Sequence, residues 1–189
     1  MRDVIINPVF KDVCTFIKTS VQTNGEYSEL EVVLGSKGKN PHHRHSAFTE
    51  TFTALEGRLG ISLNGKDLFL KPNETITVQF RDSHRFFNPD NTPCRFRIVF
   101  RPGHTGMENM LRILYGLAAD GKTNLKGVPD DITTIAILSE MGNTELTGLL
   151  SLLSPLMKWL ANKGRNAGVE RQLVETYCKR IVDLALQQA

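Results

Sequence analysis

The sequence has few cysteines and no apolar core near its start. Its three cysteines, Cys14, Cys94 and Cys178, lie far apart, and no Cys-x-x-Cys pair is present. A zinc site built on cysteine is therefore not expected. Residues 1–8 lack the apolar stretch of a signal peptide. These absences favour a cytoplasmic protein whose three thiols are buried or inert.

The chain also lacks an excess of charge of one sign. It contains 23 Lys/Arg against 20 Asp/Glu, and residues 104–189 are balanced at nine against nine, without a basic run. We therefore expect no nucleic-acid partner. The most apolar stretch, residues 146–161, includes three hydroxyl side chains and Lys158. It is shorter than the ~20 mostly apolar residues of a spanning helix, so we expect no membrane partner.

The apolar pattern changes its period once, near residue 103. A chain of 189 residues is long enough for one domain, or for one domain with a substantial appendage. We predict a mainly β domain over residues 1–103 and an α-helical extension of about four helices over residues 104–189.

Short alternating segments with turns between them fill residues 11–101. Residues 27–34 place Leu30, Val32 and Leu34 on one face, and residues 94–101 alternate apolar side chains mainly with arginines. Asn64-Gly65 is the strongest hairpin signal. Many short strands of this kind are typical of an antiparallel sandwich or barrel.

Helical spacing follows in the second half of the chain. Thr105 and Glu108 have the form of a capping box, which predicts a helix start, and His104 is interpreted as a loop residue. A second helix is expected between Pro129 and Gly142, and a third from Leu146. Pro155 either kinks that third helix or begins a new one. The last helix carries an apolar stripe made of Val169, Leu173, Tyr177, Ile181 and Leu184.

Three of the five histidines fall in the stretch His42-His43-Arg44-His45. In a strand, His43 and His45 point to one face and His42 to the other. Glu50 follows five residues after His45, and His84 lies 34 residues beyond Glu50. Imidazoles and a carboxylate are ligands that first-row metals use. The alternative is a polar loop with surface histidines.

This arrangement resembles the cupin family over roughly residues 26–101. The first cupin motif is a glycine, His-x-His, three or four residues, a glutamate, six residues and a glycine. In this chain the corresponding residues are Gly38, His43, His45, Glu50 and Gly57. The second motif has a histidine followed four positions later by asparagine, here His84 and Asn88. Glu74 stands where the turn glycine of that motif usually stands.

The resemblance implies a jelly-roll barrel, also called a double-stranded β-helix, with a metal site. The four ligands would be His43, His45, Glu50 and His84, and the ion one divalent iron, manganese, nickel, copper or zinc. Phe52 and Ala54 share a face with Glu50, and Phe86 and Asn88 share one with His84, so these four residues are candidates to line a pocket. The alternative is a cupin without metal, whose histidines only fill the barrel mouth.

The resemblance implies no single activity. One hypothesis is a metal-dependent enzyme acting on a small organic molecule with dioxygenase-like or isomerase-like chemistry. A second is a non-catalytic module that binds or senses a small molecule. A third is that the helical half serves assembly, and we expect a homodimer formed through sheet edges or through the helices.

Overall fold

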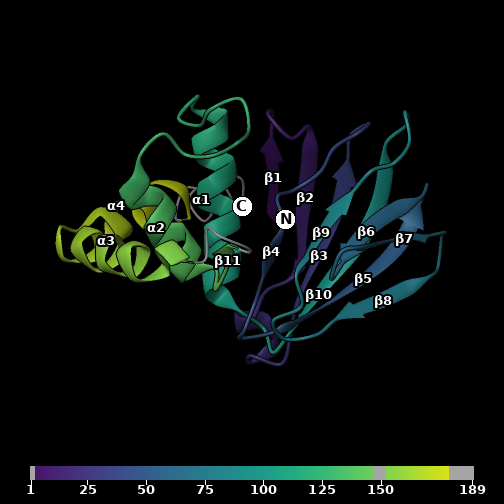
Figure 1. Ribbon diagram of the computed structural model, residues 1–189, viewed down its shortest axis with the longest axis horizontal. Helices are drawn as coiled ribbons and strands as arrows, with labels where there is room; N and C mark the ends of the chain where they lie inside the picture. Colours follow the sequence, from purple (N-terminus) through teal and green to yellow (C-terminus); the bar gives the residue numbers. More distant parts are fainter. Residues whose placement is uncertain (1–2, 147–151, 179–189) are drawn as a thin grey trace, which may run out of the picture.

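The computed structural model describes residues 3–146 and 152–178. Strands fill the first half of the chain and helices the second (Figure 1). The strands are β1 (Asp3–Asn7), β2 (Asp12–Lys18), β3 (Ser28–Leu34), β4 (His43–Arg44), β5 (Thr49–Glu56), β6 (Leu59–Leu63), β7 (Lys66–Leu70), β8 (Thr75–Val78), β9 (His84–Phe87), β10 (Cys94–Arg101) and β11 (Glu145–Leu146). The helices are a 3-10 turn at Val21–Thr23, α1 (Thr105–Ala119), α2 (Ile132–Met141), α3 (Ser154–Asn166) and α4 (Val169–Tyr177).

The strands form two antiparallel sheets. One sheet has the order β1-β2-β3-β10-β5-β8, and the other has the order β11-β4-β9-β6-β7. Strands that neighbour each other in a sheet are often far apart in sequence; β10 lies between β3 and β5, for example. This confirms the predicted jelly-roll barrel followed by helices.

The inward-facing side chains of the central strands fill the space between the two sheets. On β5, Glu50, Phe52 and Ala54 are buried and the residues between them are more exposed, as predicted. On β10, Cys94, Phe96, Ile98 and Phe100 are buried, whereas Val99 and the arginines on the other face are partly or fully exposed. Phe52 and Phe96 are at most 1% exposed. Each such side chain contributes about 1.5–3 kcal/mol by leaving water.

The turns follow the local sequence signals. Asn64 and Gly65 both have positive φ, at 49° and 82°, and they join β6 to β7 as the predicted hairpin. Asparagine and glycine tolerate this left-handed conformation better than other residues do. Strand β8 ends at Val78, and Phe80, which would continue its alternation, is 51% exposed beyond the strand.

Helix α1 lies against β1 and β2 and joins the helical half to the barrel (Figure 1). Glu108 on α1 is buried, and its Oε1 accepts hydrogen bonds from the Ser20 backbone N–H and the Ser28 hydroxyl, both at 2.6 Å. Arg112 lies one turn further along α1. It contacts Asp3 on β1 at 2.8 Å and stacks over the Phe16 ring.

The predicted capping box is wrong. His104 is the N-cap, and its Nδ1 accepts a hydrogen bond from the Met107 N–H at 2.9 Å. Glu108 turns toward the barrel because Ser20 and Ser28 offer it two buried donors there. His104 is therefore a capping residue rather than a plain loop residue.

The prediction of a third helix from Leu146 is wrong at its first residue. Glu145 and Leu146 form strand β11, which pairs with Arg44 and His43 on β4. Residues 147–151 lie outside the described part of the chain. Pro155 stands in the first turn of a new helix, α3, which was one of the two predicted alternatives. Helix α4 carries the first part of the predicted stripe, and Ile181 and Leu184 lie outside the described residues.

The three cysteines are free, as the sequence predicts. Cys14 and Cys94 are buried, and Cys178 is half-buried. Burial raises the pKa of the Cys94 and Cys178 thiols to about 11 and raises that of Cys14 further, so all three are unreactive at neutral pH. Among the described helices, none combines the length and apolar character that crossing a membrane requires.

Candidate metal centre

Both sheets contribute to one buried group of three histidines and a glutamate. His43 on β4 stands directly opposite His84 on β9 in the second sheet, and Glu50 projects inward from β5 in the first. His45 follows β4 and shares the buried face with His43, whereas His42 is exposed. The alternation predicted from His42-His43-Arg44-His45 is therefore present in the fold.

The four residues offer atoms that lie within 4.8 Å of one another. Glu50 Oε2 lies 2.6 Å from His84 Nε2, and Glu50 Oε1 lies 3.7 Å from His45 Nε2. All four side chains are buried, and the His43 and His84 rings are 4.3 Å apart between centroids. The structure thus brings together all four residues that the sequence singled out as candidate ligands.

Each of the three imidazoles is held by a hydrogen bond from Nδ1 to a backbone carbonyl oxygen. His43 bonds to Pro41 O at 2.8 Å, His45 to Asn143 O at 2.8 Å, and His84 to Asp82 O at 3.0 Å. A carbonyl only accepts, so each Nδ1 carries the proton and each Nε2 is turned toward the group, where the Nε2 of His84 already contacts Glu50 Oε2 at 2.6 Å. Metal-binding histidines are fixed in this way in proteins generally.

His45 provides the observation that tests whether an ion fits. Its Nε2 is buried and has no hydrogen-bond partner among the described residues. A buried nitrogen without a partner costs free energy unless another group occupies that position. A metal ion among three imidazoles and a carboxylate would supply the missing partner, so the residues present fit a bound transition metal.

The pKa shifts of His43, His45 and Glu50 favour the protonation states that ligands need, whereas the hydrogen bond to Glu50 favours protonation of His84. Burial lowers the pKa of His45, and burial together with the neighbouring histidines lowers that of His43 to about 3. Burial alone would raise the pKa of Glu50, but His45 and the hydrogen bond from His84 outweigh it and lower the pKa to about 2. Burial lowers the pKa of His84, but its hydrogen bond to Glu50 outweighs this, so the pKa is raised. Glu50 is therefore a carboxylate, and His43 and His45 are neutral at pH 7.

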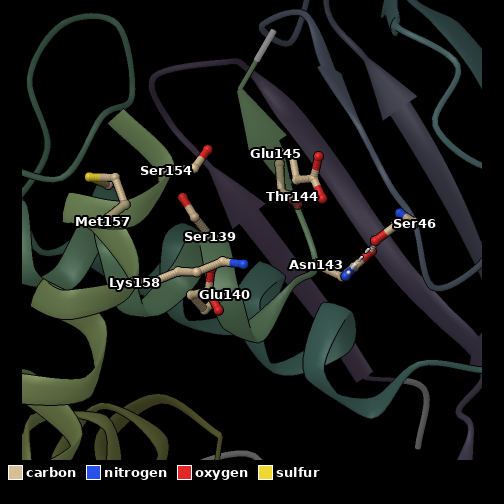
Figure 2. Close-up of a pocket in the computed structure, with 9 residues that line it drawn as sticks. All are labelled: Ser46, Ser139, Glu140, Asn143, Thr144, Glu145, Ser154, Met157 and Lys158. Atoms are coloured by element: carbon tan, nitrogen blue, oxygen red, sulfur yellow. Dashed lines mark hydrogen bonds between the residues drawn. The ribbon is translucent and has the colours of Figure 1, made fainter. Parts of the chain in front are cut away.

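Asn143, just beyond α2, supports the His45 end of this group, and the sequence did not single it out. In addition to its backbone contact with His45, its side-chain Oδ1 accepts hydrogen bonds from the N–H groups of Ser46 and Ala47 at 2.7 and 2.8 Å. Figure 2 shows Asn143 facing Ser46 at one end of a polar pocket of about 400 Å³. That pocket is lined by Ser46, Ser139, Glu140, Asn143, Thr144, Glu145, Ser154, Met157 and Lys158, and it contains none of the four candidate ligands.

A second cavity, of about 270 Å³, lies between the barrel and the helices and reaches the metal group. His43 and Glu50 are part of its lining, together with residues of β2, β3, β10, α1 and α2. Most of the lining is apolar, including Leu30, Phe100 and Met110. The helical half therefore closes one side of the space next to the candidate ligands.

Of the four predicted pocket-lining residues, Phe86 lines this cavity, and Phe52, Ala54 and Asn88 lie elsewhere in the barrel. The exposed His42 also lines the cavity. Phe52 and Ala54 are buried in the core between the sheets and are not among the residues that line the cavity. Asn88 donates to the carbonyl oxygens of Leu34, Gly35 and Thr92, and this fixes the neighbouring loops.

Asp12 and Tyr115 form a second polar feature of this cavity that the sequence reading missed. Asp12 lies on the buried face of β2 with Cys14, and Tyr115 projects from α1. The Tyr115 hydroxyl donates to Asp12 Oδ2 at 2.5 Å. The signal in the sequence was an aspartate on a strand face that otherwise carries apolar residues, because a charged side chain is seldom fully buried unless it is paired.

Comparison with known proteins places the barrel in a family. Residues 30–100 match the family described as Cupin domain. No curated protein matches the chain. The solved structures that it resembles include a predicted oxalate decarboxylase from Thermotoga maritima, with 19% identity over 54% of this chain and 92% of that chain, at a TM-score of 0.49.

Two further solved structures show similar overlap. An RmlC-like cupin from Shewanella frigidimarina has 13% identity over 55% of this chain and 86% of that chain, at a TM-score of 0.47. The polyketide cyclase RemF from Streptomyces resistomycificus has 22% identity over 48% of this chain, at a TM-score of 0.44. This chain covers 64% of that cyclase, which is less than two thirds of its length.

Proposed function

We propose that this chain, which belongs to the cupin superfamily, holds one divalent transition metal with His43, His45, Glu50 and His84 and acts on a small organic molecule in the adjoining cavity. The observation that carries the proposal is the common orientation of the three imidazoles. Each Nδ1 is bonded to a backbone carbonyl, so each Nε2 faces into one buried group that includes a carboxylate, and the Nε2 of His45 has no hydrogen-bond partner among the described residues.

A bound ion of iron, manganese, nickel, copper or zinc would supply either redox or Lewis-acid chemistry, the first for dioxygenase-like and the second for isomerase-like reactions. The residues of this chain would hold and orient the substrate. His43 and Glu50 face the cavity from the metal end, and the apolar side chains of β3, β10 and α1 exclude water from the rest of it. Exclusion of water strengthens the polar contacts at the metal end.

The test of catalysis compares three preparations of the full-length protein. One is stripped of metal with a chelator, one is reconstituted with iron, manganese, nickel or copper, and one is reconstituted with zinc. Each is incubated with a panel of small carboxylic acids, phenols and sugars, and oxygen uptake and product formation are followed. Turnover in a reconstituted preparation and not in the stripped one supports the proposal. A stripped protein that stays folded and gains nothing with any metal contradicts it.

The alternative is a non-catalytic cupin that binds or senses a small molecule, with the helical half used for dimerisation. The apolar cavity favours it as much as it favours an enzyme, because a binding module also needs a closed pocket. A ligand that raises the melting temperature without being consumed would support this alternative. Salt-sensitive binding to duplex DNA would support a regulatory version of it.

A homodimer and a cytoplasmic location belong to the same proposal. Strand β1 is an edge of the larger sheet, and its outward residues Val4 and Ile6 are 49% and 60% exposed. Edge strands with apolar residues are commonly covered by another chain. Light scattering on the purified protein tests this expectation, and a monomer at micromolar concentration would contradict it.

A further inference from the structure

Asp12 is a buried carboxylate in the lining of a mainly apolar cavity. It begins β2, faces inward with Cys14 and Phe16, and is 2% exposed. Together with Glu50 and His43 it lines the cavity of about 270 Å³ between the barrel and the helices. One cavity thus has two polar features, the metal group and Asp12, within walls that are otherwise mainly apolar.

Only one oxygen of the Asp12 carboxylate is satisfied. Oδ2 accepts the hydrogen bond from the Tyr115 hydroxyl at 2.5 Å. Oδ1 is buried and has no hydrogen-bond partner within residues 3–146 and 152–178. A buried carboxylate oxygen without a donor is costly, so such a group is expected to meet a ligand or an ordered water.

Among the residues that the structure describes, no cation supplies the missing contact. Arg112, the nearest basic residue on α1, is engaged with Asp3 at 2.8 Å. Lys39 and Lys126 also line the cavity, but both are exposed, and neither is paired with Asp12 in the described structure. The free oxygen is therefore not part of an ion pair among the described residues, and Asp12 is one of the residues that line the cavity.

We propose that Asp12, fixed by Tyr115, is a second polar anchor of the cavity and binds a protonated amine or a hydroxyl at the far end of a mainly apolar ligand. The other end of that ligand lies toward His43 and Glu50, and this part of the inference rests on the proposed metal site. The substrate class is then a small molecule with an oxygen-bearing head, an apolar middle and a hydrogen-bond donor at its tail.

The walls of the cavity match the apolar middle of such a ligand. Leu30, Val32, Ile98, Phe100, Met107 and Met110 contribute to them. The volume is just below the range of about 300–1,000 Å³ that drug-sized ligands occupy, so the ligand is small. We expect an ammonium tail to bind more tightly than a hydroxyl tail, because a buried carboxylate interacts more strongly with a cation than with a neutral donor. Burial raises the pKa of Asp12 only to about 6, so it is mostly ionised at neutral pH.

The test uses three probes of equal length that differ only in the tail. They are octanoate, ω-hydroxyoctanoate and ω-aminooctanoate, titrated calorimetrically into the zinc-loaded and the metal-free full-length protein above neutral pH. In the wild type, the affinity for ω-aminooctanoate is expected to exceed that for octanoate by about tenfold or more, because one hydrogen bond to a charged group raises affinity by at least about this factor. The affinity for ω-hydroxyoctanoate should lie between the two.

Two variants test the residues themselves. Asp12→Asn keeps the shape, but the Tyr115 hydroxyl holds its amide oxygen and the NH₂ group then faces the cavity, so the preference for the ammonium tail should disappear. Tyr115→Phe frees the carboxylate to turn and should reduce the preference without removing it. The matched control is Asp67→Asn, the same substitution at an exposed position on β7 outside the cavity lining, which should leave the preference unchanged.

The outcomes separate the anchor from the metal site. If the protein binds zinc but binds the three probes with equal affinity, or binds none of them, Asp12 is not a ligand anchor and the metal proposal is retained. Oδ1 would then be satisfied by water only. A preference that persists in Asp12→Asn also overturns the anchor. A protein that takes up none of iron, manganese, nickel, copper and zinc and still prefers ω-aminooctanoate keeps the anchor and refutes the metal site.

Discussion

The Nδ1 nitrogen of His45 lies 2.8 Å from the backbone oxygen of Asn143, 98 residues further along the chain. Asn143 follows helix α2, and its side chain also holds the backbone after His45 through Ser46 and Ala47. The helical half of the protein therefore supports a candidate ligand directly. Changes in this half are expected to alter metal binding as well as stability.

Asn143→Gly should weaken metal binding. Asn143 has φ of 49°, a conformation that glycine also accepts, so the backbone carbonyl can keep its place while the contacts to Ser46 and Ala47 are lost. Loss of a supporting contact of this kind lowers metal affinity ~10–100-fold, and we expect the lower end of that range. Competition with a chromophoric chelator measures it.

The control for this variant is Asn73→Gly. Asn73 is an exposed asparagine with φ of 72° in the turn before β8, away from the four candidate ligands. It should bind metal like the wild type. Equal affinities for the wild type, Asn143→Gly and Asn73→Gly would show that the Asn143 side chain does not support His45.

Glu50→Gln should reduce metal affinity more than Asn143→Gly does. The substitution preserves the size of the side chain but removes the only anion among the four candidate ligands. The loss should exceed the ~10–100-fold effect of an outer contact, because a direct contact to the ion is weakened. Calorimetric titration with zinc measures the change, and unchanged affinity would remove Glu50 from the ligand set.

Asp12 should make stability fall as pH rises from about 4 to about 6. Burial raises its pKa from 3.8 to about 6, so within this window the folded protein retains a proton that the unfolded chain has lost. The shift corresponds to about 3 kcal/mol of unfolding free energy, lost by pH 7. Tyr115 on α1 bonds to the Asp12 carboxyl, and Asp12, Asp3 on β1 and Arg112 on α1 all influence the neighbouring Cys14 thiol on β2.

Urea unfolding of the wild type and Asp12→Asn across this pH range measures the effect. The difference in unfolding free energy between the two proteins should change by about 3 kcal/mol between pH 4 and pH 7, in favour of Asp12→Asn at the higher pH. A constant difference would show that the Asp12 carboxyl titrates as it does in the unfolded chain.

Glu108→Ala should destabilise the docking of α1 on the barrel. The variant leaves the buried Ser20 N–H and the Ser28 hydroxyl without their acceptor, which costs about 2–3 kcal/mol. Urea unfolding measures the loss. Glu26→Ala, at an exposed position, is the control and should stay within about 0.5 kcal/mol of the wild type. Equal stabilities would mean that α1 docks without Glu108.

The sequence predicts the parts of the site that depend on local alternation. His43 and Glu50 lie on strands whose side chains point alternately inward and outward, His45 directly follows β4 and continues its alternation, and His84 completes a motif with known spacing. The barrel follows from the same alternation, as β5 and β10 show. Such features need only a few neighbouring residues to be recognised.

The remaining features depend on how the helical half packs on the barrel. Asn143 approaches His45, and Tyr115 approaches Asp12, across about a hundred residues of sequence. Leu146 fits a helical stripe in the sequence but pairs with β4, because the open edge of that strand accepts it. His104 caps α1 because Glu108 is drawn to Ser20 and Ser28. Local pattern cannot indicate these tertiary contacts.

Metal content is the most direct test of the account. Elemental mass spectrometry on the protein as purified should find close to one transition-metal ion per chain in the wild type and in His42→Ala, which removes an exposed histidine that is not one of the four candidate ligands. The His43→Ala/His84→Ala double variant should lose the metal while remaining folded. A wild type that contains no metal and refuses added iron, manganese, nickel, copper and zinc would contradict the central claim.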